Sequence, residues 1–118
     1  MNIIIKLINY PKRLLIKLKF IGKENLKDRF SIIHKNNYWD NSETVSGPGS
    51  TMKNTVNLRK KLRKIIKKYK IKSIFDAPCG DCNWIKGIIR NSSVKYIGAD
   101  IVDEIIKNNK KKFNYKNT

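Results

Sequence analysis

The stretch KSIFDAPCGDCNWIKGIIRNSSVKYIGAD, residues 72–100, decides the fold class because its hydrophobic period changes along its length. Short apolar runs at 72–77 and 94–100 predict two buried strands, and the apolar spacing over 82–90 predicts a helix between them. A second helix is expected over 102–113. Strand, helix, strand and helix in this order predict an α/β fold with a parallel sheet and right-handed crossovers.

Regular apolar spacing also predicts which face of each element is buried. Upstream of the first strand, we expect a helix that begins at Thr51 or Asn54 and ends near Tyr69, apolar on one side and very basic on the other. The side chains expected to face the core are Leu58, Leu62, Ile65, Ile66, Tyr69, Ile74, Phe75, Trp84, Ile85, Ile88, Ile89, Ile105, Ile106 and Phe113.

The first fifty residues differ in character from the rest. We divide the chain into a basic helical N-terminal extension ending in a Gly-Pro-Gly loop (1–50) and an α/β part (51–118). Lysines interrupt the apolar residues at the N-terminus, so no bilayer span is predicted there. A helix after Pro11 is expected either to dock on the protein or to lie on an anionic membrane surface. Its apolar stripe is Leu14, Leu15, Leu18 and Ile21, and the anchors expected after it are Phe30, Ile33, Tyr38 and Trp39.

The charge balance is strongly basic. The 118 residues carry a formal net charge of +18, and residues 1–70 hold 18 basic and 4 acidic side chains. This favours a nucleic-acid or anionic-membrane partner. The accompanying 19 Ile and 14 Asn favour another explanation, an AT-rich coding sequence in which Lys fills exposed positions by default. The two cysteines, without a recognised export signal, predict a cytoplasmic location, the host cytoplasm if the protein is viral.

The turn FDAPCGDCNW, residues 75–84, holds two sulfurs that suggest redox or metal chemistry. Cys79 and Cys82 form a C-x-x-C pair at a predicted helix start, where the helix dipole lowers a thiol pKa. A thioredoxin-like site needs a proline from later in the chain, and none follows Pro78. Zinc needs four ligands, and besides this pair the sequence offers His34 and carboxylates. Thiol redox chemistry is therefore a minor alternative, and no metal site is expected.

The same turn is also typical of a nucleotide-binding loop. Asp76 ends the first strand, Gly80 lets a ligand approach the main chain, and the following helix start presents backbone N–H groups. Asp100 ends the second strand, about 24 residues after Asp76, a spacing that fits one β-α-β unit. Its carboxylate can accept hydrogen bonds from both hydroxyls of a ribose. In a purely structural alternative, Asp76 and Asp81 cap a helix and Asp100 ends a strand.

The segments SIFDAPCGDCNWIKGI and YIGADIV resemble motif I and the following acidic strand end of class I S-adenosylmethionine-dependent methyltransferases. The similarity is greatest to bacterial and viral relatives with a D-x-P-C-G-D-x-x-W turn. Glu43–Ser50 and Thr55–Arg59 resemble segments that precede motif I in those relatives, so the resemblance covers roughly residues 30–113. It implies a Rossmann-like methyltransferase sheet, S-adenosylmethionine as the cofactor and methyl transfer as the reaction.

The resemblance also implies roles for single residues. The positions that match cofactor-binding positions of the family are Asp76, Cys79, Gly80, Asp81, Asp100 and Ile101. By this resemblance Asp76 contacts the methionine end, the turn at Gly80 passes under the cofactor, and Asp100 binds the ribose with Ile101 near the adenine. The loop Ser46–Ser50 is expected to close over the cofactor.

Two features depart from the family. Pro78 and Cys82 stand where the commoner G-x-G-x-G turn has glycines, so contacts there are expected to differ. The chain also offers two predicted strands, fewer than such a domain has, so we expect the N-terminal half of a truncated sheet that is inactive alone. The methyl acceptor and the catalytic residues stay open. The alternative function is a basic module that binds nucleic acid or membrane surfaces without catalysis.

Overall fold

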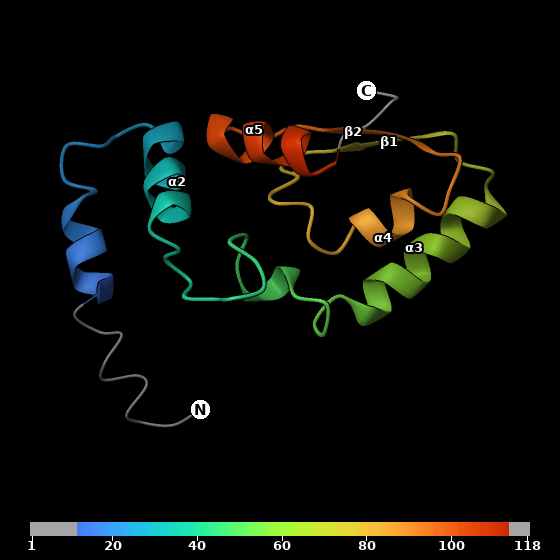
Figure 1. The fold of residues 1–118 in the computed structure, drawn as a ribbon, viewed down its shortest axis with the longest axis horizontal. Helices are drawn as coiled ribbons and strands as arrows, with labels where there is room; N and C mark the ends of the chain where they lie inside the picture. The colour runs from blue at the N-terminus through green and yellow to red at the C-terminus, as the bar shows by residue number, and fades with distance from the viewer. Residues whose placement is uncertain (1–11, 114–118) are drawn as a thin grey trace.

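The computed structural model describes residues 12–113, which form an α/β arrangement around a two-stranded parallel sheet (Figure 1). Strand β1 (Ser73–Asp76) pairs with β2 (Lys95–Gly98) along its whole length. Helix α4 (Lys86–Ile89) lies on the connection between the strands, and α5 (Asp103–Lys112) follows β2. The predicted order of strand, helix, strand and helix is therefore confirmed.

Helical segments precede the sheet. Residues 12–18 are helical, and α2 (Leu26–Lys35), the short 3-10 helix η1 (Pro48–Ser50) and α3 (Val56–Lys68) follow. In Figure 1, α2 lies beside one end of α5, whereas α3 lies at the opposite end of the molecule, beside α4. The N-terminal segments therefore reach the strand ends from one side, and α3 reaches the sheet from the other.

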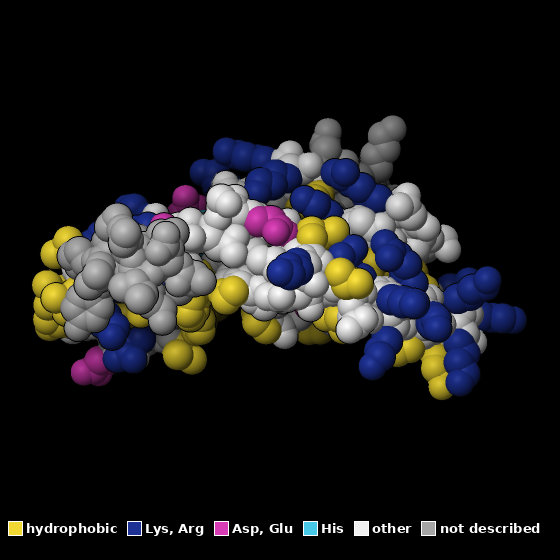
Figure 2. All heavy atoms as spheres, turned by 90° about the horizontal axis from the view of Figure 1, so that it is seen from below, with side chains coloured by type: hydrophobic (Ala, Val, Ile, Leu, Met, Phe, Trp, Pro, Cys, Tyr) yellow, Lys and Arg dark blue, Asp and Glu magenta, His cyan; other side chains and the backbone are white. Residues whose placement is uncertain are grey.

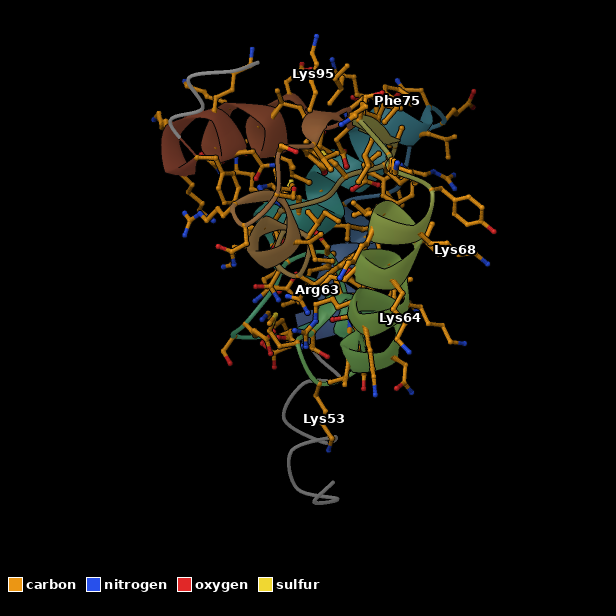
Figure 3. All side chains as sticks on the ribbon, turned by 90° about the vertical axis from the view of Figure 1, so that its right-hand side faces the viewer. Lys53, Arg63, Lys64, Lys68, Phe75 and Lys95 are labelled. Carbon is orange, nitrogen blue, oxygen red and sulfur yellow. The ribbon has the colours of Figure 1, made fainter. Side chains whose placement is uncertain are left out.

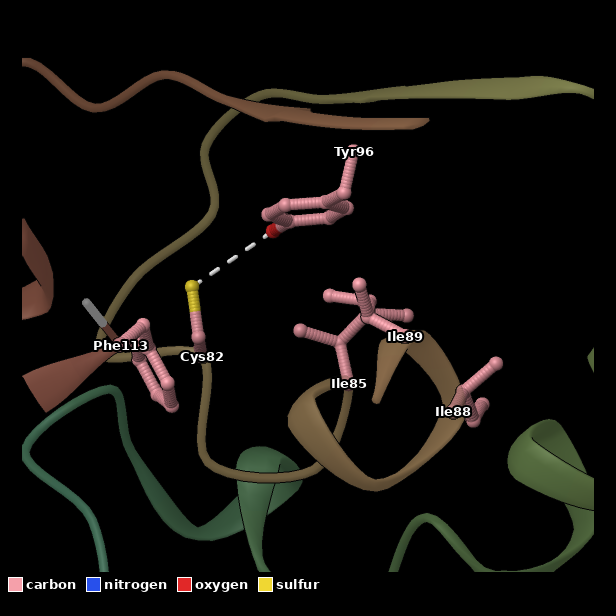
Figure 4. Close-up of a cluster of buried hydrophobic side chains, with 6 residues drawn as sticks. All are labelled: Cys82, Ile85, Ile88, Ile89, Tyr96 and Phe113. Atoms are coloured by element: carbon pink, nitrogen blue, oxygen red, sulfur yellow. Dashed lines mark hydrogen bonds between the residues drawn. The ribbon is translucent and has the colours of Figure 1, made fainter. Parts of the chain in front are cut away.

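The core lies beneath one face of the sheet (Figure 4). Tyr96 points from β2 toward Cys82 and the apolar side of α4. Partly buried side chains of Leu62 and Ile66 from α3 and Ile74 from β1 pack against this cluster. The buried members of the cluster are Cys82, Ile85, Ile88, Ile89, Tyr96 and Phe113.

The other face of the sheet is open, which corrects the expectation that Phe75 is buried. In β1 the side chains alternate, so Ile74 faces the core and Phe75 faces outward with 70% of its surface exposed. Its register partner Ile97 is 45% exposed. The apolar run predicted a strand covered on both sides, but the described residues place helices against one face of the sheet.

Two helices differ from their predicted form. The helix expected over 82–90 is shortened to α4, because Cys82 has a φ of +56°, outside the helical region. Trp84 lies half-buried in the preceding turn and still packs against the core, as expected. In α3 the apolar side is wider than its contact with the core, and three expected core residues, Leu58, Ile65 and Tyr69, are exposed.

The N-terminal helix also differs from its expected packing. The predicted docking stripe is exposed, and it consists of Leu14, Leu15, Leu18 and Ile21. Ile16, on another side of the same helical segment, is buried instead. Across residues 12–113 we find no helix with the length and apolar character needed to cross a membrane.

Candidate functional site

A cavity of about 720 Å³ lies at the carboxyl ends of β1 and β2, bounded on the far side by α2 and the loop after it. Its volume falls in the range of small-molecule sites, and this edge is where open α/β sheets bind ligands. Five of the six predicted cofactor-binding residues line it: Asp76, Cys79, Gly80, Asp100 and Ile101. Trp84 from the turn also lines it, and the facing wall includes Phe30, Ile33, His34, Trp39 and Ser46.

Asp100 is held rigidly at the mouth of the turn. Its Oδ2 accepts a hydrogen bond from the backbone N–H of Gly80 at 3.0 Å, and its Oδ1 accepts one from Val102 at 3.0 Å. Each carboxylate oxygen can accept two hydrogen bonds, so one acceptor position remains on each. The pair of backbone donors fixes the carboxylate while leaving it able to bind two hydroxyl groups.

Asp76 is fixed by a tyrosine that the sequence analysis did not single out. The hydroxyl of Tyr96 donates a hydrogen bond of 2.7 Å to Asp76 Oδ2. Burial, with the neighbouring Cys82 and Asp76, raises the pKa of the Tyr96 hydroxyl. The tyrosine therefore keeps its proton and holds the carboxylate at the edge of the cavity. The sequence signal for this contact was a tyrosine within a predicted buried strand, because a buried tyrosine hydroxyl usually has a hydrogen-bonding partner.

The backbone N–H groups of the turn are used inside the protein, contrary to the expectation that they face a ligand. Cys79 N donates to Ala99 O at 2.9 Å, and Gly80 N donates to Asp100. Asp81 N donates to Ser46 Oγ at 2.9 Å, and the next two amides are bonded within the turn. The turn is thus a poor site for a phosphate group, which would need free N–H donors.

Asp81 does not line the cavity at the strand ends and instead clasps the preceding loop. Thr44 Oγ1 lies 2.8 Å and 2.9 Å from its two carboxylate oxygens, and Ser46 Oγ lies 3.0 Å from Oδ1. The Val45 amide donates to Oδ2 at 3.1 Å. Asp81 also accepts a bond from Asn83 N within the turn, but it does not cap α4, whose N-cap is Ile85 and has no side-chain cap bond. Its position therefore favours a structural role over cofactor contact.

The clasp places the Gly-Pro-Gly loop against the turn. A Cβ atom at Gly80 would collide with the Ser46 side chain, and Gly80 itself has a φ of +55°. Asn83 Nδ2 donates to Glu43 Oε1 at 2.7 Å and to Ser50 O at 3.0 Å. The glycine thus admits a side chain of the loop, whereas the sequence suggested that it admits a ligand.

The two cysteines are free thiols with different surroundings. A hydrogen bond between them lowers the pKa of Cys82 and raises the pKa of Cys79. Cys82 is buried, 3.5 Å from the Tyr96 hydroxyl and 3.4 Å from Asn109 Nδ2, whereas Cys79 reaches the cavity. The reachable thiol is the one with the raised pKa, the reverse of what fast thiol exchange requires.

Two buried polar atoms near the site lack hydrogen-bonding partners among residues 12–113. They are His34 Nδ1 and Asn109 Oδ1. Asn109 Nδ2 donates to Gly80 O at 2.7 Å, which supports the turn from α5. His34 lines the cavity with other atoms of its side chain, while its Nδ1 is buried. In the same described part of the chain, no three side chains of His, Cys, Asp or Glu gather as a metal site would.

Comparison with known proteins adds no relative from which a function could be transferred. Neither the protein-family models, nor the curated proteins, nor the solved structures contain a match to this chain. The function must therefore be argued from the cavity itself.

Proposed function

We propose that the cavity at the strand ends binds S-adenosylmethionine, and that the chain supplies the cofactor-binding part of a Rossmann-like methyltransferase. The observation that supports this most is the joint placement of Asp76 and Asp100. Two carboxylates at neighbouring strand ends line one cavity of about 720 Å³, together with Gly80 and Ile101. Their donors, Tyr96 and backbone amides, fix both acids while leaving acceptor positions free.

The turn favours a nucleoside ligand without phosphate. Dinucleotides and nucleoside phosphates place their phosphates on free backbone N–H groups at such turns. Here the amides of Cys79, Gly80 and Asp81 already bond inside the protein. S-adenosylmethionine has a ribose and an adenine but no phosphate, so it does not need the backbone N–H groups that the turn already uses.

The remaining walls suit the rest of the cofactor. Ile101 beside Asp100 offers an apolar surface for an adenine ring next to the ribose. The cofactor supplies an electrophilic methyl group on a positively charged sulfur. The carboxylate of Asp76 and the aromatic rings of Trp39 and Trp84, which line the same cavity, would attract that charge.

The chain's part in methyl transfer is to bind and orient. Direct displacement needs alignment of the methyl group with its acceptor and does not need a nucleophile from the protein. The rigid carboxylates of Asp76 and Asp100 provide the fixed points for that alignment. We propose no catalytic base, and the methyl acceptor stays open.

Isothermal titration calorimetry with S-adenosylhomocysteine tests the assignment. The unaltered chain should bind one equivalent, and Asp100→Asn should weaken binding roughly ten- to a hundredfold, because a charged acceptor is lost. Glu104→Gln is the matched control: it removes the same charge from the exposed surface of α5.

Circular dichroism of each variant separates loss of binding from loss of folding. If the folded Asp100→Asn protein bound S-adenosylhomocysteine within twofold of the unaltered chain, the ribose assignment would be wrong. Tight binding of a nucleoside diphosphate in preference to S-adenosylhomocysteine would contradict the argument from the turn.

A further inference from the structure

The outer face of α3 is a dense basic surface without acidic partners of its own. Seven of its thirteen residues are Lys or Arg and none is Asp or Glu. Figure 2 shows these side chains gathered over α3. The ion pairs found among residues 12–113 join Lys12 with Asp40 and Lys27 with Asp103, away from this helix. The exposed cations of α3 are Lys60, Lys61, Arg63, Lys64, Lys67 and Lys68.

Further exposed lysines lie where the end of α3 leads into the sheet. Exposed Lys70 and Lys72 connect the end of α3 to β1, and Lys72 O accepts a 2.8 Å bond from the backbone of Lys95 on β2. By the strand register, Lys95 lies on the same sheet face as Phe75, which is 70% exposed. Figure 3 shows the side chains of Lys64, Lys68, Phe75 and Lys95 on this end of the molecule.

We propose that α3 and the open sheet face together bind a single-stranded nucleic acid. The lysines and arginines of α3 would track the phosphodiester backbone, and Phe75 would stack on a base. Positively charged grooves combined with exposed aromatic rings are the usual means by which proteins bind unpaired strands. Tyr69, which is 65% exposed with Lys68 Nζ 5.1 Å from its ring centroid, offers a second aromatic face beside the cations.

The geometry of α3 favours a nucleic acid over a membrane surface. A helix that lies on a bilayer buries its apolar side among the lipids and places its cations at the edges of that side. In α3 the apolar residues Leu62 and Ile66 are packed against the protein core. Val56, Leu58, Ile65 and Tyr69 stay exposed, but the six exposed cations outnumber them, so the outer surface of the helix is mainly cationic. A surface of this kind gains its affinity from phosphates and released counterions. It is also separate from the cavity at the strand ends, whose lining contains no residue of α3.

Fluorescence anisotropy with a labelled single-stranded RNA or DNA oligonucleotide tests the proposal. The double variant Lys64→Glu, Lys68→Glu should bind at least roughly tenfold more weakly, and its salt dependence should fall by roughly 1.4 in the slope of log K against log salt. The matched control is Lys107→Glu, Lys111→Glu on α5, which makes the same charge change at the same spacing on exposed positions. The control should bind nearly as well as the unaltered chain.

The aromatic contribution needs its own probe. Phe75→Ala should weaken binding of the oligonucleotide roughly five- to a hundredfold, because one stacked base is lost. Binding of an abasic oligonucleotide of equal length should not change with this substitution. Because Phe75 is mostly exposed and faces away from the core, circular dichroism of the variant should match that of the unaltered chain.

Three outcomes would overturn the proposal. Equal losses in the α3 and α5 variants would show that net charge alone drives binding. Equal affinity for the abasic and the complete oligonucleotide would remove the stacking role of Phe75. Binding to anionic vesicles that depends on Lys64 and Lys68, without binding to either nucleic acid, would assign the surface to membranes.

Discussion

Gly80 illustrates how a residue far away in the sequence can dictate a single backbone position. Its φ of +55° lies in the left-handed region, and the Ser46 side chain occupies the space where a Cβ would stand. From the sequence alone, the glycine is explained by ligand access, because the packing of Ser46 on it depends on contacts that span more than thirty residues. The sequence therefore indicates that a glycine is needed at position 80, but it does not show that the Ser46 side chain is the cause.

Substitution of Gly80 by Ala should destabilise the protein by about 1–3 kcal/mol, because strain at positive φ adds to the collision with Ser46. Gly87→Ala is the control, since a Cβ at Gly87 in α4 meets no atom within 4 Å and Ala favours a helix. Urea denaturation should show Gly87→Ala as neutral or stabilising by up to about 1 kcal/mol. Equal stability of both variants would contradict the described turn.

Tyr96 predicts a pH dependence of stability at the same scale. Burial raises the pKa of its hydroxyl above the ordinary value of 10.0, so the folded protein holds this proton more tightly than the unfolded chain does. The protonated hydroxyl therefore contributes fully to the free energy of unfolding below pH 10. This contribution is lost as the pH rises above 10, by at most about 1.4 kcal/mol per pH unit. Urea denaturation between pH 8 and 11 should show a steeper fall for the unaltered chain than for Tyr96→Phe.

The exposed Tyr69 provides the comparison for this measurement. Tyr69→Phe should retain the steep fall of the unaltered chain, because it leaves the bond from Tyr96 to Asp76 in place. Identical pH dependence in all three proteins would mean that Tyr96 is not buried against Asp76.

At the scale of elements, the loop at 41–51 and the turn at 79–83 behave as one unit. Asp81 accepts bonds from Thr44, Val45 and Ser46, and Asn83 holds two further groups of the loop. These bonds place the loop as a wall of the cavity. The sequence predicted a loop here, with Ser46–Ser50 closing over the cofactor, but it did not predict the bonds to Asp81 and Asn83. Local sequence signals predict where a loop lies, whereas its partners depend on the tertiary fold.

Asp81→Ala should release this loop. Amide hydrogen exchange should increase over residues 43–51, because the acceptor shared by three loop residues is lost, while the amides of β1 and β2 keep their protection. Glu104→Ala, which removes an exposed carboxylate from the first turn of α5, serves as the control. Unchanged exchange over the loop in Asp81→Ala would contradict the clasp.

At the scale of the whole molecule, the order of helices and strands could be predicted from the sequence, but which of their faces are buried could not. Periodicity predicted both strands, α3 and α5, because each has an apolar side of regular spacing. It could not show that Phe75 faces outward, since an apolar run does not tell which face a neighbouring element covers. Within residues 12–113, nine of the ten buried hydrophobic residues lie between 82 and 113, so the core is built from the second half of the chain.

The cavity also belongs to this scale, because it joins the strand ends to segments more than forty residues upstream. The sequence predicted Asp76, Gly80 and Asp100 at one edge of the sheet, and the structure brings them together. It did not predict His34 or the roles of Tyr96 and Ser46 around them. Trp39 and Trp84, the two tryptophans of the chain, both line the cavity and so report on whatever binds there.

Titration of the chain with S-adenosylhomocysteine, followed by tryptophan fluorescence, therefore tests the central claim most directly. The account predicts a saturable one-site change that Trp39→Phe and Trp84→Phe each reduce and that Asp100→Asn shifts to roughly ten- to a hundredfold higher concentration. A signal that does not saturate, or one that saturates at the same concentration in Asp100→Asn and the unaltered chain, would contradict the claim that this cavity holds the cofactor.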